Sequence, residues 1–181
     1  MSPIRHYYHG TTDVIETIDL SKSRFRTDFG KGFYLGTNLG IARDWAIDKT
    51  GIMGVPTVMR YVLDEVLFND EKIGKLWFDE PTSEWLDFIR DNRRIVSSDA
   101  PLSAEPRHSH DFVFGPIAND KIADVVDEYL DGHITTEEAI HRVRVMPSVF
   151  QLSLHTPLAL SFLRAAGFQQ RRSGKWSAWT Q

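Results

Sequence analysis

The densest structural signal in the chain is the run Asp28-Phe29-Gly30-Lys31-Gly32-Phe33-Tyr34-Leu35. Two glycines flank a lysine, so the backbone can turn tightly or approach a ligand closely. The aromatic residues that follow predict a short buried strand. Asn38 then predicts the cap of a helix that ends near Gly51, with apolar residues at helical spacing. The stretch therefore predicts a turn, a strand and a helix, in which Tyr34 and Trp45 either pack in the core or hold a flat ring between them.

The composition of the 181 residues suits a single domain, which we assign to residues 1–181. The absence of cysteine excludes disulfides, cysteine nucleophiles and cysteine-ligated zinc. Residues 1–10 lack the apolar run of a signal peptide, and no segment approaches the roughly 20 apolar residues that span a bilayer. We therefore expect no membrane partner and a cytoplasmic location, or delivery to the cytosol of a target cell. The net charge of −4 argues against broad nucleic-acid binding, and we interpret the arginines of 90–94 as a solvated helix end.

Strands and helices follow one another without a regular βαβ rhythm, which favours an α+β fold. We expect an exposed loop at 21–27 that borders any ligand cleft, because binding residues often lie on loops held by a rigid scaffold. Leu76-Trp77-Phe78 is interpreted as a buried patch, and 95–107 as the position of any seam. The remaining elements predicted from periodicity and capping residues are strands at 4–9, 57–63, 110–117, 149–154 and in the tail after 169, and helices at 84–93, 119–132, 135–144 and 157–166.

Two short motifs together resemble the ADP-ribosyltransferase superfamily, in the branch that contains the diphtheria toxin and poly(ADP-ribose) polymerase catalytic domains. In that branch a His-Gly-Ser/Thr strand is followed by a Gly-x-Tyr strand and then by a helix with a second aromatic residue. The matching residues here are His9-Gly10-Thr11, Gly32-Phe33-Tyr34 and Trp45. The chain is also similar to a bacterial family of domains that carry His-Gly-Thr and Gly-Lys-Gly-Phe-Tyr motifs.

The resemblance implies a split pair of antiparallel β-sheets with flanking helices around an NAD+ cleft. It implies an NAD+-dependent mono-ADP-ribosyltransferase that consumes NAD+ as a substrate, needs no metal and modifies a protein acceptor. Family association adds a toxin or effector role, with an antitoxin or inhibitor protein as a partner. The residues that the resemblance assigns to NAD+ are His9, Gly10, Thr11, Gly32, Tyr34 and Trp45, and those it assigns to catalysis are His9, Tyr34 and Gln151.

The implied roles follow the parts of NAD+. Tyr34 and Trp45 would stack on the nicotinamide, the Gly10 backbone would pair with its carboxamide, and His9 would hydrogen-bond the adenosine ribose. The transition state is oxocarbenium-like, so a third group is needed to stabilise the cation or position the acceptor.

The superfamily usually places a glutamate on a late strand for this third role. The corresponding strand here carries Gln151 and no acid. This departure argues against chain-forming polymerase activity and leaves mono-ADP-ribosylation, NAD+ hydrolysis, or binding of NAD+ or ADP-ribose without catalysis. Asp111 and Asp120 are candidates for a substitute acid or for structural roles. Arg5 and Arg26 are candidates for the pyrophosphate.

Other chemistries have weaker signals. His108-Ser109-His110-Asp111 contains metal-ligand types but has no matching distant pair. A nucleophile elbow and a Rossmann glycine fingerprint are absent from the sequence. Any NAD+ bound here is therefore expected to be consumed and not to serve as a hydride carrier.

Overall fold

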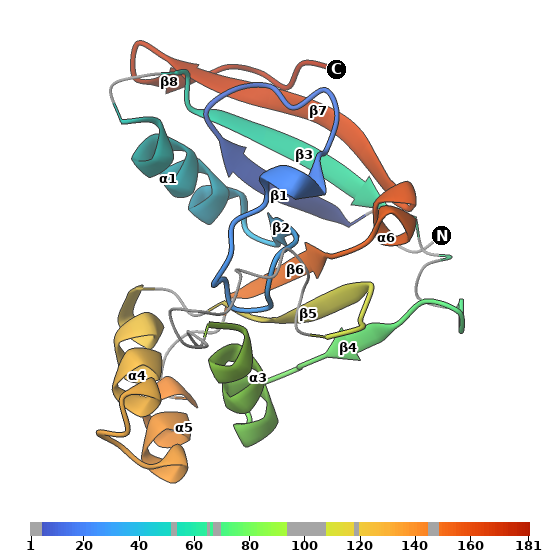
Figure 1. The fold of residues 1–181 in the computed structure, drawn as a ribbon. Helices are drawn as coiled ribbons and strands as arrows, with labels where there is room; N and C mark the ends of the chain where they lie inside the picture. Colours follow the sequence, from blue (N-terminus) through green and yellow to red (C-terminus); the bar gives the residue numbers. More distant parts are fainter. Residues whose placement is uncertain are drawn as a thin grey trace.

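The computed structural model describes residues 5–51, 54–64, 66, 70–93, 108–117, 120–144 and 149–181. Within these residues the strands form one mixed sheet in the order β4-β5-β6-β2-β1-β3-β7-β8. Helices flank the sheet, which confirms the expected α+β class (Figure 1). The strands are β1 (His6–Thr11), β2 (Phe33–Gly36), β3 (Thr57–Leu63), β4 (Lys75–Trp77), β5 (Phe112–Pro116), β6 (Phe150–Leu154), β7 (Leu163–Arg172) and β8 (Lys175–Trp176). The helices are η1 (Leu20–Lys22), α1 (Leu39–Thr50), α3 (Ser83–Arg93), α4 (Asp120–Leu130), α5 (Thr136–Arg144) and α6 (Pro157–Ser161).

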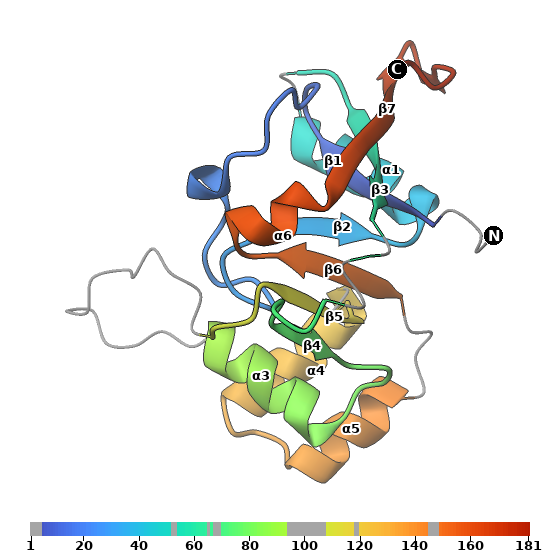
Figure 2. The same cartoon turned by 90° about the vertical axis from the view of Figure 1, so that its right-hand side faces the viewer.

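The strand pairing within the sheet is shortest between β1 and β2. β1 pairs with β3 along its whole length, and β2 pairs with β6 along its whole length, both antiparallel. Between β1 and β2, however, the register contains only Tyr8 opposite Gly36 in the part of the chain that the structure describes. Figure 2 shows the consequence: β1, β3 and β7 lie on one side of this junction, and β6, β5 and β4 continue beyond β2 on the other. The sheet therefore consists of two well-paired halves with a narrow connection.

The two faces of the sheet are covered differently, and side-chain alternation assigns each residue to a face. On one face, Phe33, Leu35, Leu152 and their neighbours form a core that the segment Val14–Leu20 and α6 cover. On the other face, α1 packs over β1 and β3, while α3, α4 and α5 form a separate core with β5. α1 and the α3–α5 group thus cover different halves of the same face (Figures 1 and 2).

Capping residues explain several boundaries that the sequence predicts. The Asn38 side chain accepts a hydrogen bond from the Ile41 N–H at 3.1 Å, so α1 begins where expected, and Gly51 follows its end with φ 51°. Thr82 accepts from the Trp85 N–H at 3.2 Å at the start of α3. Thr135 accepts from the Glu138 N–H at 3.2 Å at the start of α5. Each cap satisfies a helix N–H that has no partner within the helix.

Two expectations are wrong. The helix predicted at 157–166 ends at Ser161, and β7 begins at Leu163, because residues 163–170 pair with β3. The expectation of a buried patch at Leu76-Trp77-Phe78 is wrong for Trp77 alone: Phe78 is buried and Leu76 packs against the same core, whereas Trp77 is 40% exposed and stacks on Phe114. The seam predicted at 95–107 lies entirely outside the described residues. Among the described residues, no helix has the length and apolar character required to cross a membrane.

Candidate functional site

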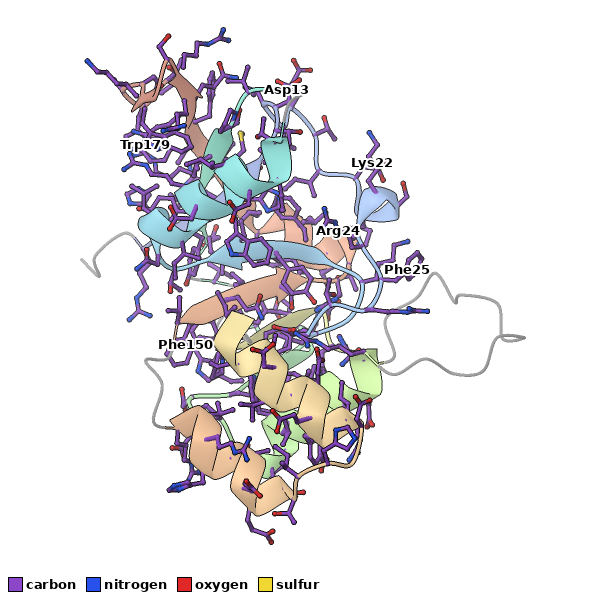
Figure 3. All side chains as sticks on the ribbon, turned by 90° about the vertical axis from the view of Figure 1, so that its left-hand side faces the viewer. Asp13, Lys22, Arg24, Phe25, Phe150 and Trp179 are labelled. Atoms are coloured by element: carbon purple, nitrogen blue, oxygen red, sulfur yellow. The ribbon has the colours of Figure 1, made fainter. Side chains whose placement is uncertain are left out.

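A cleft of about 950 Å³ lies beside the narrow β1–β2 junction. Residues from both faces of the sheet line it: Ile15 and Phe33 belong to the face that the segment 14–20 covers, and Trp45 and Arg93 come from α1 and α3 on the other. The segment between β1 and β2 forms much of its wall, which confirms that the polar loop at 21–27 borders a cleft. In Figure 3 this segment runs along one side of the molecule past Asp13, Lys22, Arg24 and Phe25, while Trp179 lies on the opposite side. The residues that line the cleft and carry the chemistry are His9, Thr11, Lys22, Arg24, Arg26, Asp28, Gly32, Tyr34, Trp45, Lys49, Arg93 and Gln151.

His9 connects β1 to β2 through a side-chain hydrogen bond. Its Nδ1 lies 2.7 Å from the Tyr34 carbonyl oxygen, and its ring stacks on Phe33. Because a carbonyl only accepts, Nδ1 carries the proton and Nε2 keeps its lone pair. Burial, followed by repulsion from Lys49, lowers the pKa of His9 to about 4, against the effect of the Tyr34 hydrogen bond. At neutral pH His9 is therefore an uncharged imidazole with an acceptor nitrogen.

Gly10 allows α1 to lie directly on β1. A Cβ at this position would be 2.3 Å from the Ala42 carbonyl oxygen and 2.9 Å from the Ala46 nitrogen, distances that no side chain tolerates. The Gly10 carbonyl accepts a hydrogen bond from Lys49 Nζ at 3.1 Å. The motif resemblance implies that the Gly10 backbone pairs with a ligand carboxamide, whereas in the structure Lys49 of the same chain donates to its carbonyl.

Tyr34 holds the glycine turn through its hydroxyl group. The hydroxyl donates to the Gly30 carbonyl at 2.6 Å and accepts from the Phe29 N–H at 3.0 Å, and Thr27 Oγ1 lies 2.8 Å away. Burial raises the pKa of Tyr34 above its ordinary value, so the phenol stays protonated. Gly30 adopts φ 81°, a conformation that favours glycine. The hydroxyl of Tyr34 is thus committed to the turn, while the residue still lines the cleft.

Trp45 and Lys49 project from α1 into the cleft one helical turn apart. Trp45 is 50% exposed, which is unusual for a large aromatic side chain and leaves its ring accessible. Lys49 Nζ lies 5.3 Å from the centroid of this ring. Of the two alternatives that the sequence leaves open, packing of Trp45 in the core is therefore wrong.

A buried ion pair stands between α3 and β6 at the cleft. Both Arg93 Nε and Nη2 donate to Asp28 Oδ1, at 3.1 and 2.5 Å. Gln151 Nε2 donates to Asp28 Oδ2 at 2.7 Å. The exposed fractions of the Arg93 and Asp28 side chains are only 18% and 10%. Arg93 is therefore not part of a solvated helix end, in contrast to the sequence-based interpretation; Arg94 lies outside the described residues.

Asp111, one of the two predicted substitute acids, does not lie beside Gln151. Asp111 accepts from the Gly74 N–H at 2.9 Å and from the Thr156 hydroxyl at 2.6 Å, so it joins the start of β5 to the cap of α6 and does not line the cleft. Asp120 is the first residue of α4, and its side chain lies outside the described part. The carboxylate next to Gln151 belongs to Asp28, which opens the glycine run.

Side chains of both charges line the cleft, five lysines and arginines and four aspartates and glutamates. Lys22, Arg24 and Arg26 contribute from the segment after β1, and Arg26 adopts the left-handed backbone conformation with φ 58°. A non-glycine residue held there costs about 1–2 kcal/mol, and such strain is concentrated at functional sites. Arg5 does not line the cleft.

Sequence reasoning missed Asp28, Lys49 and Arg93. Asp28 was visible as the first residue of the glycine run, and Lys49 lies four residues after Trp45, the spacing that places two side chains on one helix face. Nothing in the sequence paired Arg93 with Asp28. Among the described residues no group of three or more histidine, aspartate or glutamate side chains is arranged to hold a metal ion.

Residues 6–165 match the model of a family described as "Protein of unknown function (DUF3990)". No match was found among curated proteins or among solved structures.

Proposed function

The chain belongs to the DUF3990 family, and from the residues of its cleft we propose that it is an NAD+-dependent mono-ADP-ribosyltransferase acting on a protein acceptor. One observation carries the proposal. Five of the six residues that the motif resemblance assigns to NAD+ line a single cleft, although they come from two strands, a turn and a helix. Gln151, from a strand much later in the chain, lines the same cleft.

The dimensions and chemistry of the cleft suit a dinucleotide. Its volume of about 950 Å³ lies at the upper end of the range of small-molecule sites. Trp45 offers an exposed aromatic face to a flat ring. Lys22, Arg24 and Arg26 supply positive charge for a pyrophosphate, with the arginines able to form paired hydrogen bonds.

The proposed reaction breaks the bond between nicotinamide and C1 of its ribose. Nicotinamide leaves with the bonding electrons, a nucleophile of the acceptor bonds to the same carbon, and the nucleophile loses a proton. The ribose carbon carries positive charge in the transition state, which a nearby carboxylate stabilises. Asp28 supplies that negative charge, and its hydrogen bond fixes the amide of Gln151, which would contact a ribose hydroxyl.

The same ion pair favours a second candidate function. Arg93 neutralises much of the charge of Asp28, and the late strand β6 has no acid of its own. A module that binds NAD+ or ADP-ribose without transfer, or an NAD+ glycohydrolase, would have this arrangement as well.

Incubation of the purified protein with NAD+ and a cell lysate tests these alternatives, with free nicotinamide and ADP-ribose mass shifts followed together. Nicotinamide release with a labelled protein supports the transferase. Release without a labelled macromolecule supports the glycohydrolase. Binding of NAD+ without release supports the non-catalytic module, and failure to bind NAD+ contradicts the proposal.

Gln151→Ala tests the site itself. We expect it to slow nicotinamide release about 100-fold, a typical loss for one polar group that contacts the transition state. Gln169→Ala is the matched control: Gln169 is also a buried glutamine with one charged partner, Arg43, but it lies outside the cleft. Equal losses in both variants would mean that the effect is structural.

Exchanging the carboxylate of Asp28 with the amide of Gln151 tests which of the two positions must carry the negative charge. Gln151→Glu alone would put two carboxylates in contact, because Gln151 Nε2 lies 2.7 Å from Asp28. The double variant Asp28→Asn with Gln151→Glu keeps one acid and one amide in the pair. A higher rate in the double variant would identify the natural chain as a weakened transferase, and a large loss would show that Asp28 and Gln151 work in their present positions.

A further inference from the structure

Lys49 reaches from α1 across to β1 and lines the cleft. Its Nζ donates to the Gly10 carbonyl at 3.1 Å and lies 5.3 Å from the centroid of the Trp45 ring. An aromatic face and a carbonyl oxygen together form a small site for a cation. In this chain the cation is the lysine ammonium.

Lys49 has no acidic partner in the described structure. None of the ion pairs among the described residues includes it, although Asp13, Glu16 and Asp19 also line the cleft. Desolvation of the ammonium and repulsion from Arg24 lower the pKa of Lys49 to about 8, so the ammonium is held at an electrostatic cost. The residue as a whole is exposed, so its side chain can leave the Gly10 carbonyl and extend into solvent.

We propose that Lys49 occupies the position of the positively charged nicotinamide ring and must be displaced when NAD+ binds. The inference rests on the proposed function, which assigns the Trp45 face and the Gly10 backbone to this ring and its carboxamide. Two cations cannot share one aromatic face and one carbonyl, since like charges at such separations repel strongly. Lys49 therefore selects against NAD+ but leaves ADP-ribose, which has no nicotinamide, unaffected.

Lys49→Met tests the proposal because it keeps an unbranched side chain only one atom shorter and removes its charge. Calorimetric titration should show NAD+ binding about tenfold more tightly to this variant than to the natural protein, as expected when a cation–π contact and a charged hydrogen bond no longer have to be broken. The affinity for ADP-ribose should not change. Lys49→Arg keeps the charge and should not gain affinity for NAD+.

Lys175→Met is the matched control, since Lys175 is an exposed lysine of β8 outside the cleft. It removes the same unit of charge and should change neither affinity. If Lys49→Met weakens both NAD+ and ADP-ribose, Lys49 is a phosphate-binding cation and the proposal is overturned. Unchanged NAD+ affinity in Lys49→Met also overturns it.

The N-methylnicotinamide cation separates this inference from the proposed function, because it contains the charged ring without ribose or phosphate. We expect it to bind Lys49→Met and not the natural protein. If NAD+ binds neither protein while this cation still distinguishes them, the proposed function fails and the role of Lys49 stands. If the cation binds both proteins alike, or neither, the role of Lys49 is overturned.

Discussion

His155 is a buried base that supports the glycine turn. Its Nδ1 lies 2.8 Å from the Lys31 carbonyl and its Nε2 lies 2.8 Å from Ser153 Oγ, so the neutral ring donates at one nitrogen and accepts at the other. The residue is 6% exposed. Burial lowers the pKa of His155 to about 4, although the hydrogen bond to Lys31 opposes the shift. At neutral pH an uncharged imidazole therefore holds the Lys31 carbonyl of the turn.

This burial predicts a loss of stability in mild acid. Between pH 6.5 and about 4 the unfolded chain binds a proton at His155 that the folded protein excludes. The free energy of unfolding should therefore fall as the pH decreases through this range, by up to about 1.4 kcal/mol per pH unit for this histidine. Urea denaturation from pH 7 to pH 4.5 measures the slope.

His155→Gln should reduce that slope, and His133→Gln should not, because His133 is exposed. His9 has a similarly lowered pKa and contributes a slope of its own, so some dependence on pH should remain in both variants. An identical slope in His155→Gln and the natural protein would contradict the assignment.

At the scale of elements, the contact between α1 and β1 is the closest approach in the site, and it predicts the effect of Gly10→Ala. The added methyl group would meet backbone atoms of Ala42 and Ala46, which cannot move without displacing the helix. We expect the free energy of unfolding to fall by about 2 kcal/mol or more, a typical cost of overpacking. Gly36→Ala is the control, since a Cβ at this strand glycine would meet nothing closer than 3.9 Å. Thermal or urea denaturation of both variants gives the comparison, and equal stabilities would mean that α1 is not held at this distance.

The elements differ in how far local sequence determines them. α1 was predictable because Asn38, the helical spacing and Gly51 all act within one segment. The strand at 57–63 was predictable because its β-branched and aromatic residues suit a buried strand. Residues 163–166 have good helix formers, yet they form β7 because pairing with β3 outweighs a propensity of a few tenths of a kcal/mol per residue. β4 has only three residues, too few for a periodic pattern.

At the scale of the whole molecule, the cleft combines residues whose partners lie far apart in the sequence. His9, Tyr34 and Trp45 could be named in advance because they belong to recognisable short motifs. The partners of Asp28 could not, because Arg93 and Gln151 follow it by 65 and 123 residues and meet it only when α3 and β6 pack on the turn. Side-chain pairs between such distant residues form only in the completed fold. Local patterns in the sequence, such as hydrophobic periodicity and capping residues, do not predict them.

The narrow connection between the two half-sheets leads to a prediction about motion across the whole molecule. Local opening beside a weakly paired junction should let the backbone amides of 13–28 and of β2 exchange with solvent faster than those of β3, which is paired on both sides.

A ligand in the cleft contacts both halves of the sheet, through α1 on one side and β6 on the other. ADP-ribose at about 100 times its dissociation constant should therefore slow exchange across the junction, because only the closed state binds it. α5 is the internal control, since it lies at the far end of the molecule and contributes no residue to the cleft (Figure 1). Hydrogen–deuterium exchange followed by mass spectrometry measures both regions in one experiment. Protection of 13–28 and β2 with α5 unchanged is the expected result, whereas protection confined to α5 would place the ligand elsewhere.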